Sequence, residues 1–278
     1  MDIPVLLVVL LSAVLQAGWN VLLKLRLDPL SSLMLVVLGG GMVALPFALW
    51  LGLPERPLWP WMAGSMAAHI GFYACLAGAY ARADLGLVYP VARGGALLMT
   101  AGIAITVLHE PIGPIGIAGI ALLAAGVLVT GWRSRDEASQ SVALGLALGS
   151  AAAVTAYSII DGTAAHMGSP ATYTAWLFVG DAVLVLVGLS VWKGPAFLRP
   201  VMRHLPLALA GGAMLFVSYW LCVWAMARAP ISLVAAVREA SVLFAAAFAV
   251  LVLHERLRPE RAVAALFVVA GVTLIKLH

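Results

Sequence analysis

The sequence predicts an all-α membrane protein, with ten transmembrane helices in two inverted five-helix repeats around a central cavity. Three observations predict this fold: the composition, the lengths of the apolar stretches, and a repeat within the chain. Of the 278 residues, 64% are hydrophobic and only 10% are charged. Soluble domains carry about 25% charged residues, so most of this chain is built to lie in lipid.

Ten apolar stretches follow one another, separated by short polar segments or by breaks that contain Pro or Gly. Each is close to the length of about 20 residues that a helix needs to cross a bilayer. In hydrocarbon the backbone must bond to itself, and the stretches lack the alternation of barrel strands, so helices are expected. The stretches are Ile3–Leu23, Leu30–Leu51, Leu58–Tyr80, Leu85–Leu108, Ile115–Trp132, Val142–Ile160, Ala171–Trp192, Leu205–Met226, Ile231–Leu253 and Ala262–Leu277.

The second half of the chain repeats features of the first half. Leu108-His109-Glu110 recurs as Leu253-His254-Glu255, an offset of 145 residues, and Arg238 lies at the same offset from Arg93. Arg, His and Glu are rare here, so these matches carry more weight than matches of Ala or Leu. The two His-Glu pairs lie at helix ends, where capping or anchoring of a loop explains them.

The repeat divides the chain into residues 1–137 and residues 138–278, each with five predicted helices. An odd number of helices inserts the second half upside down relative to the first. Such an inverted pair creates a site near the midplane of the membrane that can open to either side in turn.

Several classes of function are excluded by what the chain lacks. The longest polar segments, Arg133–Ser141 and Lys193–His204, are too short for a soluble catalytic or nucleic-acid-binding domain. No HExxH or Gly-x-Ser-x-Gly motif occurs, and no filter motif of an ion channel is visible. Cys75 and Cys222 lie inside predicted helices as small buried residues. We therefore expect no enzyme, no metal site, no cofactor and no nucleic-acid partner.

Five ionisable residues fall inside the predicted spans: Arg93, Asp161, Asp181, Arg238 and Glu239. A charge at membrane depth is costly unless it is paired or faces water, so such residues are candidates for function. The repeat suggests that both guanidinium groups face one cavity, where their forked donors suit a carboxylate or a phosphonate. The alternative, that each Arg is held in a structural ion pair with one of the three carboxylates, stays open.

Helical spacing supplies polar and aromatic neighbours for these charges. Structural packing explains many aromatic residues in a membrane protein equally well. The candidate substrate-binding residues are Gln16, Trp19, Asn20, His69, Tyr73, Tyr89, Arg93, Tyr157, Asp161, Tyr219, Arg238 and Glu239.

Small residues indicate where helices approach each other closely. Gly145 and Gly149 form a GxxxG spacing, and Gly39–Gly41 and Gly211–Gly212 are runs of glycine. Pro90 removes a backbone hydrogen bond in the helix that carries Arg93, which predicts a kink there, either static or serving as a hinge.

Several short motifs along the chain are characteristic: Gln16-Ala17-Gly18-Trp19-Asn20, Tyr89-Pro90-Val91-Ala92-Arg93-Gly94, His109-Glu110 before Pro114, Ala156-Tyr157 through Asp161-Gly162, Val237-Arg238-Glu239 and His254-Glu255-Arg256-Leu257. Through these motifs the whole chain resembles the EamA family of the drug/metabolite transporter superfamily. The resemblance implies a multi-pass carrier of the inner (plasma) membrane. Family members move many kinds of metabolite, so the resemblance does not name a substrate, although a similar pattern is associated with phosphonate use and export is the commoner direction.

The orientation stays open, because two arguments disagree. Cytoplasmic loops are enriched in Lys and Arg. Eleven such residues fall on one side and three on the other, which places both termini outside, whereas the arrangement familiar in EamA-like proteins has both inside. The larger group is Lys24, Arg26, Arg82, Arg133, Arg135, Lys193, Arg199, Arg203, Arg256, Arg258 and Arg261, and the smaller is Arg56, Arg228 and Lys276.

These observations predict a secondary transporter of a small polar metabolite, anionic or zwitterionic, such as an amino acid, a carboxylate or a phosphonate. A structural or sensory membrane component is the alternative, although it gives no reason to bury two Arg residues. Coupling to protons through Asp161 or Glu239 stays open beside uncoupled facilitated diffusion. The expected partners are the small-molecule substrate and the lipid bilayer, with the protein as a monomer or a homodimer.

Overall fold

The computed structural model describes residues 1–23, 29–83, 85–129, 140–194, 198–251 and 259–277. Within these ranges the regular elements are helices. They are α1 (Ile3–Leu23), α2 (Pro29–Leu51), the 3₁₀ turn η1 (Arg56–Leu58), α3 (Trp59–Tyr80), α4 (Leu85–Thr106), α5 (Pro114–Val129), α6 (Gln140–Ala164), α7 (Pro170–Lys193), α8 (Leu198–Arg203), α9 (Leu205–Met226), α10 (Ile231–Arg238), α11 (Ser241–Leu251) and α12 (Pro259–Leu277).

Each of the ten predicted stretches contains helix, with one correction. The ninth, Ile231–Leu253, is two helices, α10 and α11, because Glu239 and Ala240 form a turn between them. In this turn the backbone bonds are those of a tighter helix, as from Glu239 N to Ala236 O (3.0 Å) and from Ala240 N to Val237 O (2.9 Å). The short helix α8 was not predicted and lies in the polar segment before α9.

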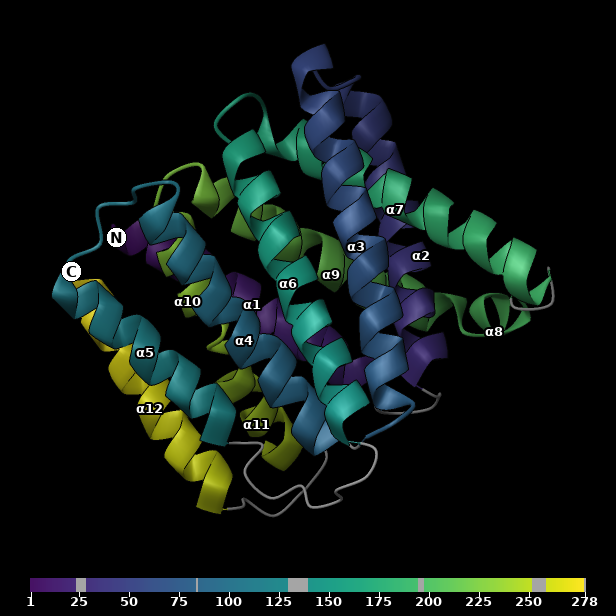
Figure 1. The fold of residues 1–278 in the computed structure, drawn as a ribbon. Coiled ribbons are helices and arrows are strands. Elements are labelled where there is room, and N and C mark those ends of the chain that lie inside the picture. Colours follow the sequence, from purple (N-terminus) through teal and green to yellow (C-terminus); the bar gives the residue numbers. More distant parts are fainter. Residues whose placement is uncertain (24–28, 84, 130–139, 195–197, 252–258, 278) are drawn as a thin grey trace.

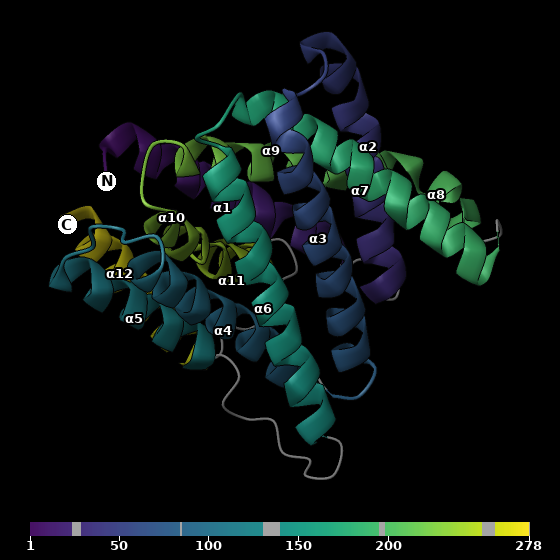
Figure 2. The same ribbon diagram turned by 45° about the horizontal axis from the view of Figure 1, so that its top comes forward.

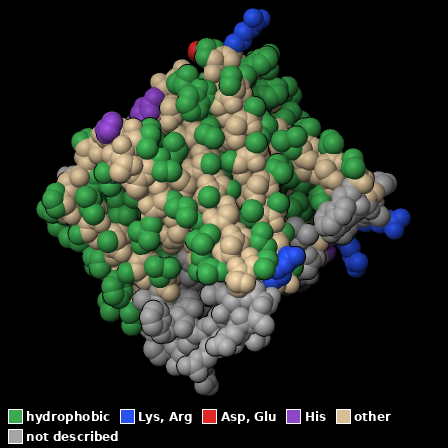
Figure 3. Space-filling view, viewed as in Figure 1, with side chains coloured by type: hydrophobic (Ala, Val, Ile, Leu, Met, Phe, Trp, Pro, Cys, Tyr) green, Lys and Arg blue, Asp and Glu red, His purple; other side chains and the backbone are tan. Residues whose placement is uncertain are grey.

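The helices have the length and composition of a multi-pass membrane protein. Six of the described segments are long and apolar enough to cross a bilayer: Ile3–Asn20, Ser31–Leu51, Arg56–Tyr80, Ser141–Ala164, Pro170–Val191 and Leu205–Met226. Three shorter apolar helices accompany them, namely Val91–Thr106, Pro114–Leu128 and Val263–Leu277. Hydrophobic side chains are spread over the whole face shown in Figure 3, whereas its few Lys and Arg side chains lie at the top and in the lower right part of the view.

Helices far apart in the sequence pack side by side (Figures 1 and 2). Helix α3 packs along α6, and α1 packs along α9. Helix α2 lies against α7 and α9, while α5 lies against α12 at the opposite side of the molecule. Helices α4 and α10 lie between these groups, and α4 contacts α5, α6 and α10.

The core falls into two main hydrophobic clusters. One gathers buried residues of α1, α4, α5, α9, α10 and α12, including Val9, Leu123 and Val234. The other gathers buried residues of α2, α3, α4, α6, α7 and α9, including Leu177 and Tyr173. Helices α4 and α9 contribute to both clusters, so residues on these two helices lie where the clusters meet.

Glycine allows the closest helix approach, at the crossing of α2 and α9. A Cβ atom at Gly212 would lie 2.2 Å from the backbone carbonyl carbon of Gly39, and one at Gly39 would lie 1.9 Å from the carbonyl oxygen of Ala208. The predicted close approach at these glycines is therefore confirmed. The GxxxG prediction is half wrong: a Cβ atom at Gly149 would meet Cys75 Sγ at 3.1 Å, but one at Gly145 would meet nothing within 4 Å.

The Gly212→Ala substitution should destabilise the fold, because its Cβ atom would collide with backbone that cannot turn aside. We expect a loss of roughly 1–3 kcal/mol, as for an overpacked core. The matched control is Gly145→Ala, which adds the same methyl group in open space on α6. Thermal unfolding of the purified protein in detergent measures both, and equal melting temperatures for the two variants would contradict the close crossing.

Candidate functional site

The carboxylate of Glu110 holds the start of the short helix α10. It accepts hydrogen bonds from Ile231 N (2.5 Å), Ser232 N (3.2 Å) and Ser232 Oγ (2.5 Å). The first N–H groups of a helix have no partner within it, and the positive end of the helix dipole favours a negative charge. The capping role predicted for the first His-Glu pair is therefore confirmed for Glu110, while Glu255 lies outside the described residues.

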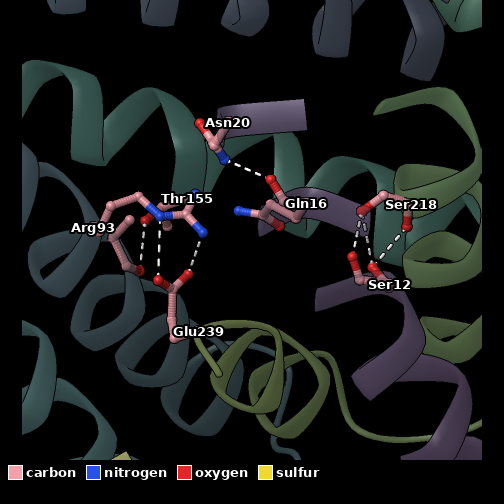
Figure 4. A network of polar contacts seen from close by, with 8 residues as sticks. Ser12, Gln16, Asn20, Arg93, Thr155, Ser218 and Glu239 are labelled. Atoms are coloured by element: carbon pink, nitrogen blue, oxygen red, sulfur yellow. Dashed lines mark hydrogen bonds and ion pairs between the residues drawn. The ribbon is translucent and has the colours of Figure 1, made fainter. Parts of the chain in front are cut away.

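The other end of α10 is tied to α4 by an ion pair (Figure 4). Arg93 Nε donates to Glu239 Oε2 at 3.2 Å, and Arg93 Nη2 donates to Glu239 Oε1 at 2.5 Å. The two parallel bonds use the forked geometry that makes Arg–carboxylate pairs strong and directional. Only 12% of the Arg93 side chain and 8% of the Glu239 side chain are exposed, so the pair lies inside the protein.

A small pocket, with room in this state for little more than a water molecule, lies beside this ion pair. Its walls come from α4, α6, α9 and α10, together with the turn after α10. The hydroxyls of Thr100 and Thr155 lie 3.2 Å apart, and Thr155 Oγ1 donates to Ala96 O at 3.2 Å, which ties α4 to α6 at the pocket wall. The lining residues are Arg93, Ala96, Leu97, Thr100, Val154, Ser158, Met226, Ala235, Arg238 and Glu239.

Arg238 brings a second guanidinium group to the pocket. The residue is only 9% exposed, and its Nε atom has no hydrogen-bond partner. The guanidinium carbon lies 5.1 Å from the centre of the Tyr219 ring, where the face of the ring attracts a cation. A buried N–H without an acceptor is costly, so this group is suited to an acidic ligand that supplies one.

Asp161 is held by two tyrosines rather than by an Arg. Tyr173 OH donates to Asp161 Oδ1 at 2.6 Å, and Tyr219 OH donates to Asp161 Oδ2. The carboxylate is fully buried on α6, and the tyrosines come from α7 and α9. Because both carboxylate oxygens are engaged, Asp161 anchors Tyr219, on whose ring face Arg238 lies.

His69 and Asp181 form a second buried polar pair behind Tyr219. His69 Nδ1 on α3 lies 2.7 Å from Asp181 Oδ2 on α7. The His69 ring centre is 4.3 Å from that of Tyr157 and 5.9 Å from that of Tyr219. The Tyr73 ring stacks against the His69 ring, with 6.3 Å between the ring centres. The aromatic rings therefore connect the His69–Asp181 pair with Arg238 and the pocket.

The structure brings most of the predicted substrate-binding residues into these two adjoining groups. Arg93, Arg238 and Glu239 line the pocket. His69, Tyr73, Tyr157, Asp161 and Tyr219 form the cluster next to it.

The three candidate substrate-binding residues of α1 lie in different surroundings. The Gln16 side chain points toward the Arg93–Glu239 pair in Figure 4, and its Oε1 atom is buried without a partner. Asn20 Nδ2 donates to Gln16 O at 2.7 Å, a bond within α1. Trp19 packs against a cluster formed by Leu35, Val36 and Ala208 and does not line the pocket.

Tyr89 and Pro90 lie in α4, but their side chains are outside the described part of the structure, so the predicted kink at Pro90 is not tested.

Two members of the cluster, Asp181 and Tyr173, were not among the predicted substrate-binding residues. The sequence indicated Asp181 as a buried charge and as one possible partner for an Arg. In the structure the partner of Asp181 is His69. The sequence did not single out Tyr173, which carries no charge and has no counterpart in the repeat. The only signal for Asp181 was its depth in an apolar stretch, and no signal in the sequence indicated Tyr173.

Comparisons with known proteins agree with this architecture. Residues 141–277 match the model of the EamA-like transporter family. A solved structure titled "Crystal structure of protein" is similar over 100% of this chain and 98% of its own, with a TM-score of 0.82 and 18% identity. At that identity the likeness shows the fold alone. Comparison with curated proteins found no match.

The Glu110→Gln substitution should loosen the start of α10, because the amide has no negative charge and one acceptor fewer for the three donors. We expect a cost of about 1 kcal/mol, as for the loss of a helix cap. Amide hydrogen exchange over Ile231–Arg238 should become faster. The control is Glu55→Gln, since Glu55 precedes η1 without a side-chain cap. Unchanged exchange in the Glu110 variant would show that the cap does not hold α10.

Proposed function

The chain belongs to the EamA-like transporter family, and from that premise we propose that it is a secondary transporter of a small polar metabolite with an acidic group, either anionic or zwitterionic. Family membership makes it a membrane transporter of the drug/metabolite type. The solute class, the transport mechanism and the solute-binding site at Arg238 are our proposal. An amino acid, a carboxylate or a phosphonate fits it.

We propose ten spans in two inverted halves, residues 1–137 and 138–278. The helix contacts support this arrangement. If α1 to α5 correspond to α6, α7, α9, α10–α11 and α12, then the contact of α3 with α6 corresponds to that of α9 with α1. The contacts of α2 with α7 and of α5 with α12 correspond to themselves, as an axis between the halves requires.

The observation that carries the proposed function is Arg238. Its guanidinium is buried at the wall of a pocket, and its Nε atom lacks an acceptor. Arg93, its counterpart in the repeat, has its charge balanced by Glu239. A carboxylate or phosphonate bound in the pocket would offer two oxygens to the fork of Arg238, which is the geometry that Arg favours.

Alternating access is proposed for the motion, and two features support it. The pocket has walls from both halves of the chain, so movement of one half against the other changes its opening. The turn at Glu239 and Ala240 interrupts the apolar run next to Arg238, and such broken helices are typical of transporter sites. The Arg93–Glu239 pair joins the halves in the state described here.

A structural or sensory membrane component is the second candidate, and Arg238 argues against it. A purely structural Arg in lipid is expected to have a full set of partners, as the forked bonds of Arg93 illustrate. The inner membrane as location is carried over from the family and belongs to the proposal, whereas the direction of transport follows from the gradients of the solute and of any coupled ion.

The Arg238→Gln substitution should weaken binding of the solute by at least about tenfold, because hydrogen bonds to a charged donor contribute roughly 1.5–3 kcal/mol. A thermal-shift screen of purified protein with 2-aminoethylphosphonate, alanine and succinate identifies the solute class. Uptake of the labelled solute into proteoliposomes then measures transport, and recovery of the solute intact distinguishes a carrier from an enzyme.

Arg228→Gln is the matched control, since Arg228 is exposed at the end of α9 and lies over Trp224 instead of the pocket. If the Arg238 variant folds and transports like the wild type, the guanidinium is structural and the proposed site is wrong.

A further inference from the structure

His69 and Asp181 are buried and charged or chargeable, yet neither lines the pocket. His69 is 7% exposed and Asp181 is 4% exposed, and Asp181 Oδ1 has no hydrogen-bond partner. A buried carboxylate with a free oxygen is costly unless positive charge lies nearby. An imidazolium at His69, 2.7 Å away, supplies that charge, whereas a neutral imidazole does not.

The charge balance of the described interior leads to the same conclusion. Among the described side chains, three carboxylates and two guanidinium groups are buried at the site: Asp161, Asp181 and Glu239 against Arg93 and Arg238. With all five of these groups ionised, one negative charge is left over while His69 is neutral. Uncompensated charge inside a membrane protein is expensive, and one proton on His69 balances it.

Other groups around His69 modulate this proton. Burial of the ring disfavours the charged form, Asp181 and Asp161 attract the proton, and Arg238 repels it across the Tyr219 ring. The groups that face His69 are Asp181 on α7, Asp161 on α6, Arg238 on α10, Tyr73 on α3, Tyr157 on α6 and Tyr219 on α9. Arg238 alone among them also lines the pocket.

We propose that the His69–Asp181 pair is the proton-binding site of this carrier, and that Arg238 couples it to the solute pocket. This inference rests on the proposed function for its solute, and it replaces Asp161 and Glu239 as candidates. Both oxygens of Asp161 are taken by tyrosines, and Glu239 is paired with Arg93. The site takes a proton from water on the imidazole and returns it to water.

The sign of the coupling follows from the charges. An acidic group bound at Arg238 offsets the guanidinium charge and so removes its repulsion of the imidazolium. Protonation of His69 then becomes more favourable, and by reciprocity a protonated His69 strengthens binding of the acidic group by the same factor. Proton and solute therefore bind together, and solute binding takes up protons from solution.

The test needs no solute, because Arg238→Gln removes the same charge that a bound acidic group would offset. Full-length protein with isotope-labelled histidine is placed in lipid nanodiscs, and the ring nitrogen resonances are followed by NMR from about pH 5 to 9, the range in which histidine titrates. The His69 resonances are those missing in His69→Gln. We expect His69 to gain its second proton within this range.

At a given pH, Arg238→Gln should raise the ratio of imidazolium to imidazole at His69 by roughly tenfold. This is the expected Coulomb effect of one unit charge on the other side of the Tyr219 ring, for an effective dielectric constant of about 20. Asp181→Asn should lower the ratio. Arg238→Lys keeps the charge and should resemble the wild type, as should the surface control Arg228→Gln.

A His69 ring that keeps one protonation state over the whole range would overturn the proposal, and so would an unchanged ratio in Arg238→Gln. Either result leaves the proposed function to be judged separately, by whether the wild type binds a solute and Arg238→Gln weakens it.

Discussion

The ion pair between Arg93 and Glu239 is the interaction on which the site depends. Each residue alone would place an uncompensated charge inside an apolar bundle, and together they form two hydrogen bonds between α4 and the turn after α10. With Glu110 at its start and Arg93 bound to Glu239 just past its end, α10 is held at both ends by charged groups from other segments. That binding fixes where Arg238, the last residue of α10, can place its guanidinium.

The surrounding packing explains why the charges can be buried at all. Helices α4 and α9 contribute to both hydrophobic clusters, and α4 carries Arg93 while α9 carries Tyr219. The polar groups therefore lie at the junction of the two clusters. Tyr219 connects two of these polar groups, because its hydroxyl donates a hydrogen bond to Asp161 and its ring face lies against the Arg238 guanidinium. Removal of one member leaves another buried without its partner.

The helices could be predicted from the sequence, because the thickness of the bilayer sets the length of each apolar run. The predicted bounds Ile3–Leu23 and Leu205–Met226 agree with α1 and α9. The break after Arg238 could not be predicted, since that run contains no Gly or Pro and the break accompanies a contact with Arg93, 146 residues away. The pairing of His69 with Asp181 depends on which helices become neighbours, which a single sequence does not state.

A thermodynamic cycle tests the ion pair most directly, with Glu239→Gln, Arg93→Gln and the double variant compared by unfolding. We predict that Glu239→Gln costs roughly 3–5 kcal/mol, because it leaves the guanidinium of Arg93 inside the protein without its ion-pair partner. Arg93→Gln should cost less, since Glu239 can turn to its neighbour Arg238, and adding it to Glu239→Gln should restore part of the lost stability. Costs that simply add, with no recovery in the double variant, would contradict an ion pair at the centre of the site.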